Sequence, residues 1–549
     1  MTKGKGMTIN GNGNSHRIGS LGIRPSLVLF GVFSCFTVWA IHVLSAATWL
    51  DASGNRYYVL FDDAMISMRY AFNLAHGHGL VWNVGERVEG YTNPLWTIIM
   101  AALQWISNPY VAPLLVQLAG LVLLLGAAGF AFLAGKELAG ETTAWRHLAG
   151  ILSATGVLGY YPLAFWSLAG MEVSLLGCAL SAGVLATIRF HNGNEIRHLN
   201  ALLLCIIVAY FTRPDGWLPF IPMALFCVRR SLQVDTFAHL VKKTLAVVLT
   251  GGGLIAAHLV WRFLYYGSFV PNTYVLKMQG RPLDLRLTNG LSFISPYLLS
   301  ISIALALAIF AALIAERNKR SLYLSLVSVP LVAVAYQIFV GGDPWPYWRQ
   351  MAPSFFLLPL ASSCGLLALK RIPRANTLLL TVIFFCIFVF GVFVLPNKDF
   401  RREALLQIPP FSFPHNVFHG RTGLALHEVL TPRASVMAFW AGAIPYFASC
   451  YGVDPLGKMD PYVARLPLDT GVAWAGMRGV PGHDKYDLRH SLVERSPDYI
   501  QGWKWFNQDE SAYVRTNYVL AVHQGLGLCL KRDSKHVHWD RVKIVGECK

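Results

Sequence analysis

The chain has 549 residues, of which 54% are hydrophobic and only 14% are charged. Soluble domains carry about a quarter charged residues, so this composition excludes an ordinary soluble enzyme. A formal net charge of +17 would suggest nucleic-acid binding in a soluble protein. Here the Lys and Arg residues lie in short clusters between apolar runs, as the charges that orient membrane proteins do. Nucleic acid is therefore not an expected partner.

The first apolar run, 26–47, follows a Gly- and Asn-rich amino end at 1–25 that carries Lys3, Lys5, Arg17 and Arg24. A helix needs about 20 apolar residues to cross a bilayer, and this run is long enough. We expect a first membrane span with a cytoplasmic tail at 1–25. A cleaved signal peptide is the alternative, but the run is longer than a usual signal sequence and many apolar runs follow it.

Further apolar runs fill most of the chain up to residue 395. They are 94–135, 148–165, 172–190, 199–212, 216–228, 244–265, 290–315, 321–340, 352–369 and 375–395. One set of loops between them is basic, as at Arg229, Arg230, Lys242 and Lys243, and basic loops face the cytoplasm. The alternate loops are polar and aromatic and are expected on the outer face. These outer loops are 51–93, 166–172, 213–217, 265–289 and 341–349.

The run 94–135 determines the number of crossings. If it crosses once, with its first part along the outer interface, the polytopic α-helical domain at 26–395 has about eleven spans. Two crossings there would place every later basic loop on the outer face, against the rule that basic loops face the cytoplasm. Thirteen spans is the alternative count. Eleven spans place the carboxyl-terminal part of the chain outside the cytoplasm.

From about residue 396 the composition becomes that of a soluble domain, with short β-type runs such as 434–439 and 518–521 among Pro and Gly turns. We expect 396–549 to form a small soluble, mixed α/β domain on the extracytoplasmic side. Three of the nine cysteines, Cys450, Cys529 and Cys548, lie in it. One disulfide is expected if the compartment is oxidising, and the sequence leaves the pairing open.

The first outer loop, 48–93, is dense in ionisable groups. Asp62 and Asp63 open a predicted helix, on which Asp62, Arg69 and Asn73 share one face. A carboxylate near apolar surroundings can act as a general base, and a neighbouring cation favours its charged form. The alternative is that the two aspartates only begin an interfacial helix. A metal site formed by His76, His78 and the aspartates is weakly indicated, so no metal is expected.

Two later outer loops carry cations beside aromatic residues. Lys277 and Arg349 oppose the usual charge bias of outer loops, and a cation near the outer headgroups suits a lipid phosphate. The aromatic residues around them are also typical of an interfacial belt. Arg213 and Asp215 are predicted to form an internal ion pair at a helix break.

Taken in order, these motifs resemble those of the GT-C glycosyltransferases, which are multi-span enzymes that use polyprenyl-phosphate sugars. The likeness is marked for the terminal β-arabinofuranosyltransferases of actinobacterial cell-wall synthesis. It rests on Asp62-Asp63 with Ile66 and Arg69, on Asn83, Gly85 to Glu89 and Asn93 to Trp96, on Gly342-Asp343 with Tyr347 and Arg349, and on Asp454, Gly457, Asp460-Pro461, Arg465 and Gly482 to Lys485.

The resemblance implies an inverting transfer of a sugar, expected to be arabinofuranose, from a polyprenyl-phosphate donor at the outer face of a bacterial inner membrane. Position in the motif assigns the general base to Asp62, with Asp63 in support, and needs no cofactor beyond the lipid-linked donor. Arg69, Lys277 and Arg349 are the expected phosphate-binding residues. The expected substrate-binding residues are Glu86, Arg87, Glu89, Asn272, Asp343, Tyr347, His483 and Lys485.

The expected acceptor is an extracytoplasmic glycan, a lipid or a pilin-like protein. The alternative function is a transporter or flippase of lipid-linked glycans, which would need ionisable groups near the bilayer midplane or paired repeats of broken helices. The acidic residues instead cluster at the outer ends of spans, and no internal repeat is evident. A non-catalytic scaffold for envelope assembly is a third hypothesis.

Overall fold

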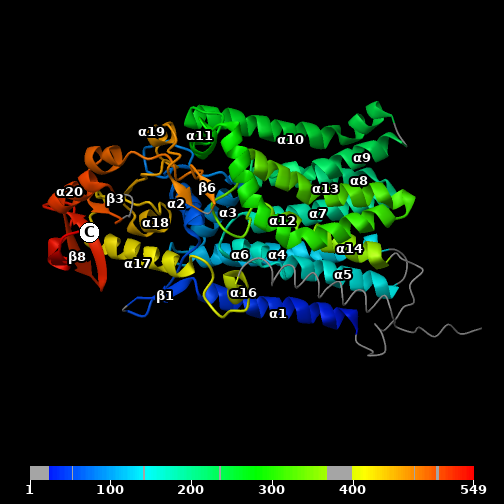
Figure 1. The fold of residues 1–549 in the computed structure, drawn as a ribbon, viewed down its shortest axis with the longest axis horizontal. Coiled ribbons are helices and arrows are strands. Elements are labelled where there is room, and N and C mark those ends of the chain that lie inside the picture. Colours follow the sequence, from blue (N-terminus) through cyan, green and yellow to red (C-terminus); the bar gives the residue numbers. More distant parts are fainter. Residues whose placement is uncertain are drawn as a thin grey trace, which may run out of the picture.

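The computed structural model describes residues 24–51, 53–139, 143–233, 236–367, 398–474, 476–502 and 506–548. Figure 1 shows an elongated molecule, with a bundle of long helices at one end and a smaller region of strands and short helices at the other. Between them lie α2 (Asp62–Ala75), α11 (Asn272–Met278) and α18 (Ala443–Ala448). We call the zone around these three helices the junction.

The bundle consists of apolar helices that run between the junction and the far end of the molecule. They are α1 (Pro25–Ser45), α4 (Ala112–Leu138), α5 (Thr143–Leu158), α6 (Tyr161–Leu168), α7 (Val173–Gly193), α8 (Ile196–Thr212), α9 (Ile221–Leu232), α10 (Phe237–Tyr266), α12 (Leu283–Ile314), α13 (Arg317–Val340) and α14 (Leu357–Leu367). Six of the described helices are long and apolar enough to cross a membrane, or seven if the bent pair α5–α6 counts as one span. The protein is a multi-pass membrane protein.

The predicted count of eleven spans, or thirteen, is not confirmed. The runs 199–212 and 216–228 and the described part of 352–369 form helices shorter than a full span, and 375–395 lies outside the described residues. Helix α8 ends at Thr212 because Pro214 forces Arg213 into an extended backbone, with φ −153° and ψ 138°.

The run 94–135 divides into α3 (Pro94–Trp105) and α4. Between the two helices the chain is still at the junction, because Tyr446 Oη donates a hydrogen bond to Pro109 O (2.7 Å) and Tyr58 N donates one to Tyr110 O (3.3 Å). Only α4 therefore leaves the junction for the far end of the bundle.

The predicted outer loops come together at the junction. Trp166 Nε1 donates to Tyr347 O (3.2 Å), which joins the loops 166–172 and 341–349. Asn272 Nδ2 donates to Gly457 O (2.9 Å), which joins α11 to the carboxyl-terminal part of the chain. A short hairpin of β1 (Thr48–Leu50) and β2 (Arg56–Tyr58) begins the first outer loop.

The described residues between 398 and 548 form a carboxyl-terminal α/β region, which is the fold class predicted for this part of the chain. Its sheet has the order β10-β8-β9-β7-β3-β4, with β3 parallel to β4 and β7 and the other pairs antiparallel. The strands are β3 (Ser435–Met437), β4 (Tyr451–Val453), β7 (Tyr499–Ile500), β8 (Tyr518–His523), β9 (Leu526–Lys531) and β10 (Lys543–Gly546), with a separate pair β5 (Ala473–Trp474) and β6 (Met477–Arg478). The helices are α16 (Lys398–Ala404), α17 (Phe413–Val429), α18, α19 (Pro461–Ala464) and α20 (Gln508–Asn517).

Successive residues of β3 point to opposite faces of this sheet, so Val436 packs in one apolar cluster with α17 and Met437 in another with α20. A disulfide joins Cys529 to Cys548, and Cys450 is a buried free thiol. The structure thus resolves the pairing that the sequence left open.

Two glycines allow the first outer loop to contact the carboxyl-terminal region closely. A Cβ atom on Gly442 would overlap the Asp62 carbonyl oxygen, and one on Gly452 would overlap the Trp82 ring. A side chain at either position would therefore force the two parts of the chain apart. The site at the junction is built from both.

Candidate active site

Asp62 and Asp63 begin α2 and point in different directions, because successive residues on a helix are about 100° apart. Asp62 is buried, and its two carboxylate oxygens accept hydrogen bonds from Ala443 N (2.9 Å) and Gly442 N (3.1 Å) at the start of α18. Burial raises the pKa of Asp62 to about 6. This carboxylate ties α2 to α18 and does not line the cavity described below.

Asp63 is surrounded by cations. Its Oδ1 atom lies 2.8 Å from Lys458 Nζ, and its Oδ2 atom lies 3.3 Å from Arg349 Nη1 and accepts a hydrogen bond from Trp345 Nε1 (3.2 Å). Burial alone would raise the pKa of Asp63, but the charges of Lys458, Arg349 and Lys277 outweigh burial and hold this pKa well below its usual range. Asp63 is therefore ionised.

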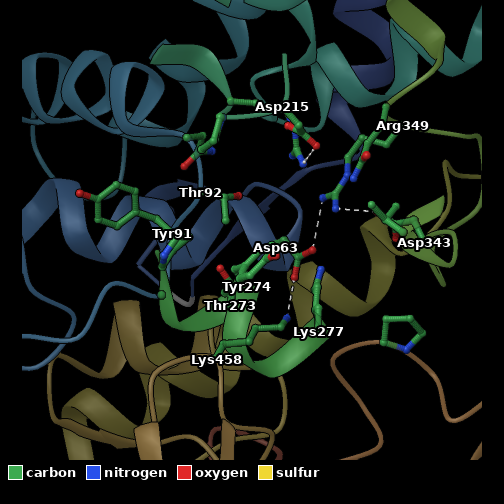
Figure 2. A pocket seen from close by; sticks show the side chains of 18 of the residues that line it. Asp63, Tyr91, Thr92, Asp215, Thr273, Tyr274, Lys277, Asp343, Arg349 and Lys458 are labelled. Atoms are coloured by element: carbon green, nitrogen blue, oxygen red, sulfur yellow. Dashed lines mark hydrogen bonds and ion pairs between the residues drawn. The ribbon is translucent and has the colours of Figure 1, made fainter. Parts of the chain in front are cut away.

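Asp63 lines a cavity of about 440 Å³ at the junction, which we call the central cavity. Figure 2 shows Lys458 and Lys277 on one side of Asp63, with the Arg349 guanidinium between Asp63 and Asp343. The charged residues that line the cavity are Asp63, Glu172, Arg213, Asp215, Arg262, Lys277, Asp343, Arg349 and Lys458. A cavity of this size with a few convergent polar groups is typical of a small-molecule site.

One end of the central cavity is rich in hydrogen-bond donors that lack partners. Lys277 Nζ makes no hydrogen bond or ion pair with any other described residue, and burial lowers its pKa. Within the described ranges, Arg349 Nε, Arg262 Nη2 and Thr273 Oγ1 are buried and also lack a partner. Buried donors without partners are rare and costly, so this end suits an anion that accepts from several of them.

The other end is formed by an ion-paired cluster. Arg213 Nη1 lies 2.8 Å from Glu172 Oε1, and Arg213 Nε lies 3.0 Å from Asp215 Oδ1. Asn93 Nδ2 donates to Glu172 Oε2 (3.1 Å), which connects the cluster to the first outer loop. The predicted internal pair of Arg213 and Asp215 is confirmed.

Arg69 was expected to bind phosphate, but the structure places it away from the central cavity. It is buried, donates to Trp82 O (2.7 Å), Cys450 O (2.5 Å) and Pro445 O, and stacks 4.8 Å from the Trp82 ring centre. Burial lowers the pKa of Arg69 to about 10. Its donors are occupied by backbone carbonyls, so Arg69 holds α2 against the carboxyl-terminal region.

The three charged residues of the first outer loop that were expected to bind substrate also lie outside the cavity lining. Glu86 accepts from Tyr451 Oη (2.6 Å), and the Arg87 guanidinium stacks 4.7 Å from the Tyr265 ring centre. Glu89 pairs with Arg262 (2.8 Å), and burial raises the pKa of Glu89 to about 7. Of this pair, only Arg262 lines the cavity.

Of the other expected substrate-binding residues, Asp343 alone lines the cavity, where it lies 2.9 Å from Arg349 Nη2. Asn272 donates to Gly457 O, Tyr347 Oη donates to Glu403 (2.7 Å), and Lys485 Nζ donates to Gln279 O (2.9 Å). His483 is buried beside the Trp345 and Trp474 rings, and burial lowers its pKa to about 3. These four side chains therefore hold the chain segments around the junction together and do not line the cavity.

Lys458 lines the central cavity and pairs with Asp63, and the sequence did not predict it as a site residue. It lies in a polar turn after β4 that reads as an ordinary capped loop, and 395 residues separate it from Asp63. The available signal was its position between Gly457 and Asp460, two residues of the family motif. No group of three or more metal-ligating side chains converges in the described part of the chain, and His76 Nδ1 bonds instead to Phe72 O (2.8 Å).

Comparisons with known proteins agree with this fold. Residues 412–540 match a family model described as a domain of unknown function (DUF8728). The chain is 26% identical to a terminal beta-(1->2)-arabinofuranosyltransferase of Mycobacterium tuberculosis over 326 residues, which are 54% of this chain and 49% of that protein. It is also 26% identical to the Corynebacterium glutamicum protein of the same name, over 55% of this chain and 47% of that protein. The chain thus matches about half the length of these relatives.

Two solved structures share the architecture. The structure of ArnT from Cupriavidus metallidurans bound to undecaprenyl phosphate superposes with a TM-score of 0.56 and 12% identity, over 92% of this chain and 99% of that one. An Archaeoglobus fulgidus oligosaccharyltransferase tethered to an acceptor peptide gives a TM-score of 0.50 and 10% identity, over 94% and 75%. The chain has the fold of the GT-C glycosyltransferases, and the resemblance that its motifs predicted is confirmed.

Proposed function

We propose that this protein is a membrane glycosyltransferase that transfers a sugar from a polyprenyl-phosphate donor to an acceptor hydroxyl, with inversion at the anomeric carbon. The observation that carries the proposal is the ionised Asp63 in the central cavity, with Lys458, Arg349 and Lys277 around it. The names of the relatives make arabinofuranose the best-supported sugar.

The donor phosphate would lie at the end of the cavity that has partnerless donors. Lys277 Nζ and Arg349 Nε are free to bond to its oxygens, and Arg262 Nη2 and Thr273 Oγ1 add two further donors. Negative charge grows on the phosphate as the bond to the sugar breaks. Fixed cations at this place stabilise the leaving group more strongly in the transition state than in the ground state.

We assign the general base to Asp63 instead of Asp62, which differs from the assignment by motif position. Asp63 faces the cavity, whereas both oxygens of Asp62 are occupied by the backbone of α18. In the empty site the low pKa of Asp63 makes it a weak base. A bound phosphate would compete for Lys458 and Arg349, so the pKa of Asp63 would rise and the carboxylate would become able to take the acceptor proton.

The acceptor would reach Asp63 from the carboxyl-terminal side of the junction. We propose that this side faces outward from a bacterial inner membrane, which the positive-inside pattern of the loops supports. The acceptor is then an extracytoplasmic glycan, a lipid or a pilin-like protein.

A transfer assay with the full-length protein in nanodiscs tests the function. The donor is radiolabelled polyprenyl-phosphoryl arabinofuranose, and the acceptor is an arabinose oligosaccharide. We expect the label in a new glycosidic bond on the acceptor. In liposomes, movement of the labelled lipid between leaflets without bond formation would instead establish the transporter hypothesis.

A further inference from the structure

The two ends of the central cavity carry opposite excess charge. At one end the cations Lys277, Lys458, Arg349 and Arg262 outnumber the lining carboxylates Asp63 and Asp343 by two. At the other end the single cation Arg213 faces two carboxylates, Glu172 and Asp215. Figure 2 shows Asp215 and Lys458 on opposite sides of the pocket, with Asp63 and Arg349 between them.

The acidic end is rigid and presents acceptors. Arg213 is held by both carboxylates, and the side chains of Arg213 and Asp215 are 13% and 19% exposed. Glu172 is fixed by Asn93 and Arg213 and is almost fully buried. A carboxylate offers about four lone-pair sites, so Asp215 retains acceptor capacity beyond its two bonds from Arg213 and its bond from Tyr336.

The two ends of the cavity lie next to each other, so that a single donor molecule can contact both. Arg349 interacts electrostatically with Glu172 as well as with Asp63, and both ends line the same cavity of about 440 Å³. A donor whose phosphate binds at Lys277 can therefore reach Asp215 with its sugar, because both residues line the same cavity.

We infer that the cluster of Glu172, Arg213 and Asp215 is the sugar-selecting part of the donor site, which accepts polyhydroxyl sugars that are neutral or cationic and rejects sugars that carry a carboxylate. Neutral hydroxyls donate hydrogen bonds to the spare lone pairs of Asp215. A uronate would bring a further negative charge against two fixed carboxylates in a partly buried site, where like charges repel strongly. This inference rests on the proposed function.

The test compares two donors that differ only at one carbon, polyprenyl-phosphoryl glucose and polyprenyl-phosphoryl glucuronate. Each competes with labelled undecaprenyl phosphate for the full-length protein in nanodiscs. For the unmodified protein we expect the glucuronate lipid to bind at least about tenfold more weakly than the glucose lipid. Asp215→Asn should reduce this ratio severalfold, and Glu172→Gln should act in the same direction.

Asp284→Asn is the matched control, because Asp284 is an exposed carboxylate in the first turn of α12 that does not line the cavity. It should leave the ratio unchanged. Binding of plain undecaprenyl phosphate checks that each variant is folded. Equal binding of the two sugar lipids, or a ratio that Asp215→Asn does not change, would overturn the inference while leaving the proposed function intact. Absence of undecaprenyl phosphate binding in the unmodified protein would overturn both.

Discussion

The Lys458 ammonium lies 2.8 Å from the Asp63 carboxylate, although 395 residues separate the two along the chain. Lys458 comes from the turn after β4 in the α/β region, and Asp63 comes from the first turn of α2. Both side chains are mostly buried, at 12% and 16% exposure. The α/β region therefore supplies part of the charged site and is not an appendage of the helical bundle.

Removal of the Lys458 ammonium tests this contribution. Lys458→Ala should lower kcat/KM for sugar transfer by about 100-fold, because a fixed cation that stabilises the transition state is worth a few kcal/mol in a water-poor site. Lys458→Arg should retain part of the activity, since it keeps the charge. Lys535→Ala, which removes an exposed lysine from the same region, is the control. Full activity of Lys458→Ala would show that the ion pair is only structural.

The sequence predicted the helical membrane part, the α/β region and the helix that the two aspartates begin, because apolar length and helix-start residues are local signals. It did not predict which aspartate faces the cavity. That depends on the position of α18, which contacts Asp62 from 380 residues away. Arg69 was assigned to phosphate for its charge and helix face, but carbonyl groups of the distant α/β region occupy its donors. Such long-range partners have no signature in the local sequence.

The pH dependence of stability should separate the roles of the two aspartates. The pKa of Asp62 is about 6 in the folded protein, above its usual 3.8. Folding therefore favours the protonated form of Asp62. The stability that this form contributes is fully present below pH 3.8 and is lost as pH rises through 6. The Tm of the unmodified protein minus that of Asp62→Asn should fall between pH 4.5 and pH 7.

Asp63 provides the internal control for this experiment. Its pKa is lowered, so its stabilising contribution is already present above the usual pKa of 3.8 and is lost only at lower pH. The Tm difference between the unmodified protein and Asp63→Asn should therefore stay constant from pH 4.5 to pH 7. A flat profile for Asp62→Asn would contradict the buried, raised-pKa state of Asp62.

The buried pair of Glu89 and Arg262 should behave as one unit. Both side chains are almost fully buried and lie 2.8 Å apart. Above pH 7, where Glu89 is ionised, Glu89→Gln leaves the Arg262 charge unpaired and should destabilise the protein by about 3–5 kcal/mol. Adding Arg262→Met to Glu89→Gln should recover much of that loss in a thermal double-mutant cycle. Simple additivity of the two changes would show that the pair is not coupled.

The Cys529–Cys548 disulfide should be present in protein isolated from cells, because the α/β region is proposed to face an oxidising compartment. The chain has nine cysteines, so seven should react with maleimide after denaturation without reductant, and all nine after reduction. Intact-mass spectrometry counts these additions. Nine additions without reductant would argue for a reducing compartment.

Reduction of this disulfide should also lower stability. The bond closes a loop over a sequence separation of 19 residues, which corresponds to about 3 kcal/mol in the chain-entropy model. Cys529→Ser, Cys548→Ser and the double variant should therefore lose the same amount, as judged by the melting of the α/β region. A double variant that loses the sum of both single effects would count against the bond.

Asp63, and not its neighbour Asp62, is proposed to take the proton from the acceptor. Single-turnover transfer from labelled polyprenyl-phosphoryl arabinofuranose should be measured for Asp63→Asn and Asp62→Asn, with undecaprenyl phosphate binding as the test of folding. We predict that Asp63→Asn loses at least about 1,000-fold in rate while it still binds the lipid, because both base and site charge are changed. Asp62→Asn should keep measurable turnover with a lowered Tm. Abolished transfer in a well-folded Asp62→Asn variant, beside an active Asp63→Asn, would contradict the account.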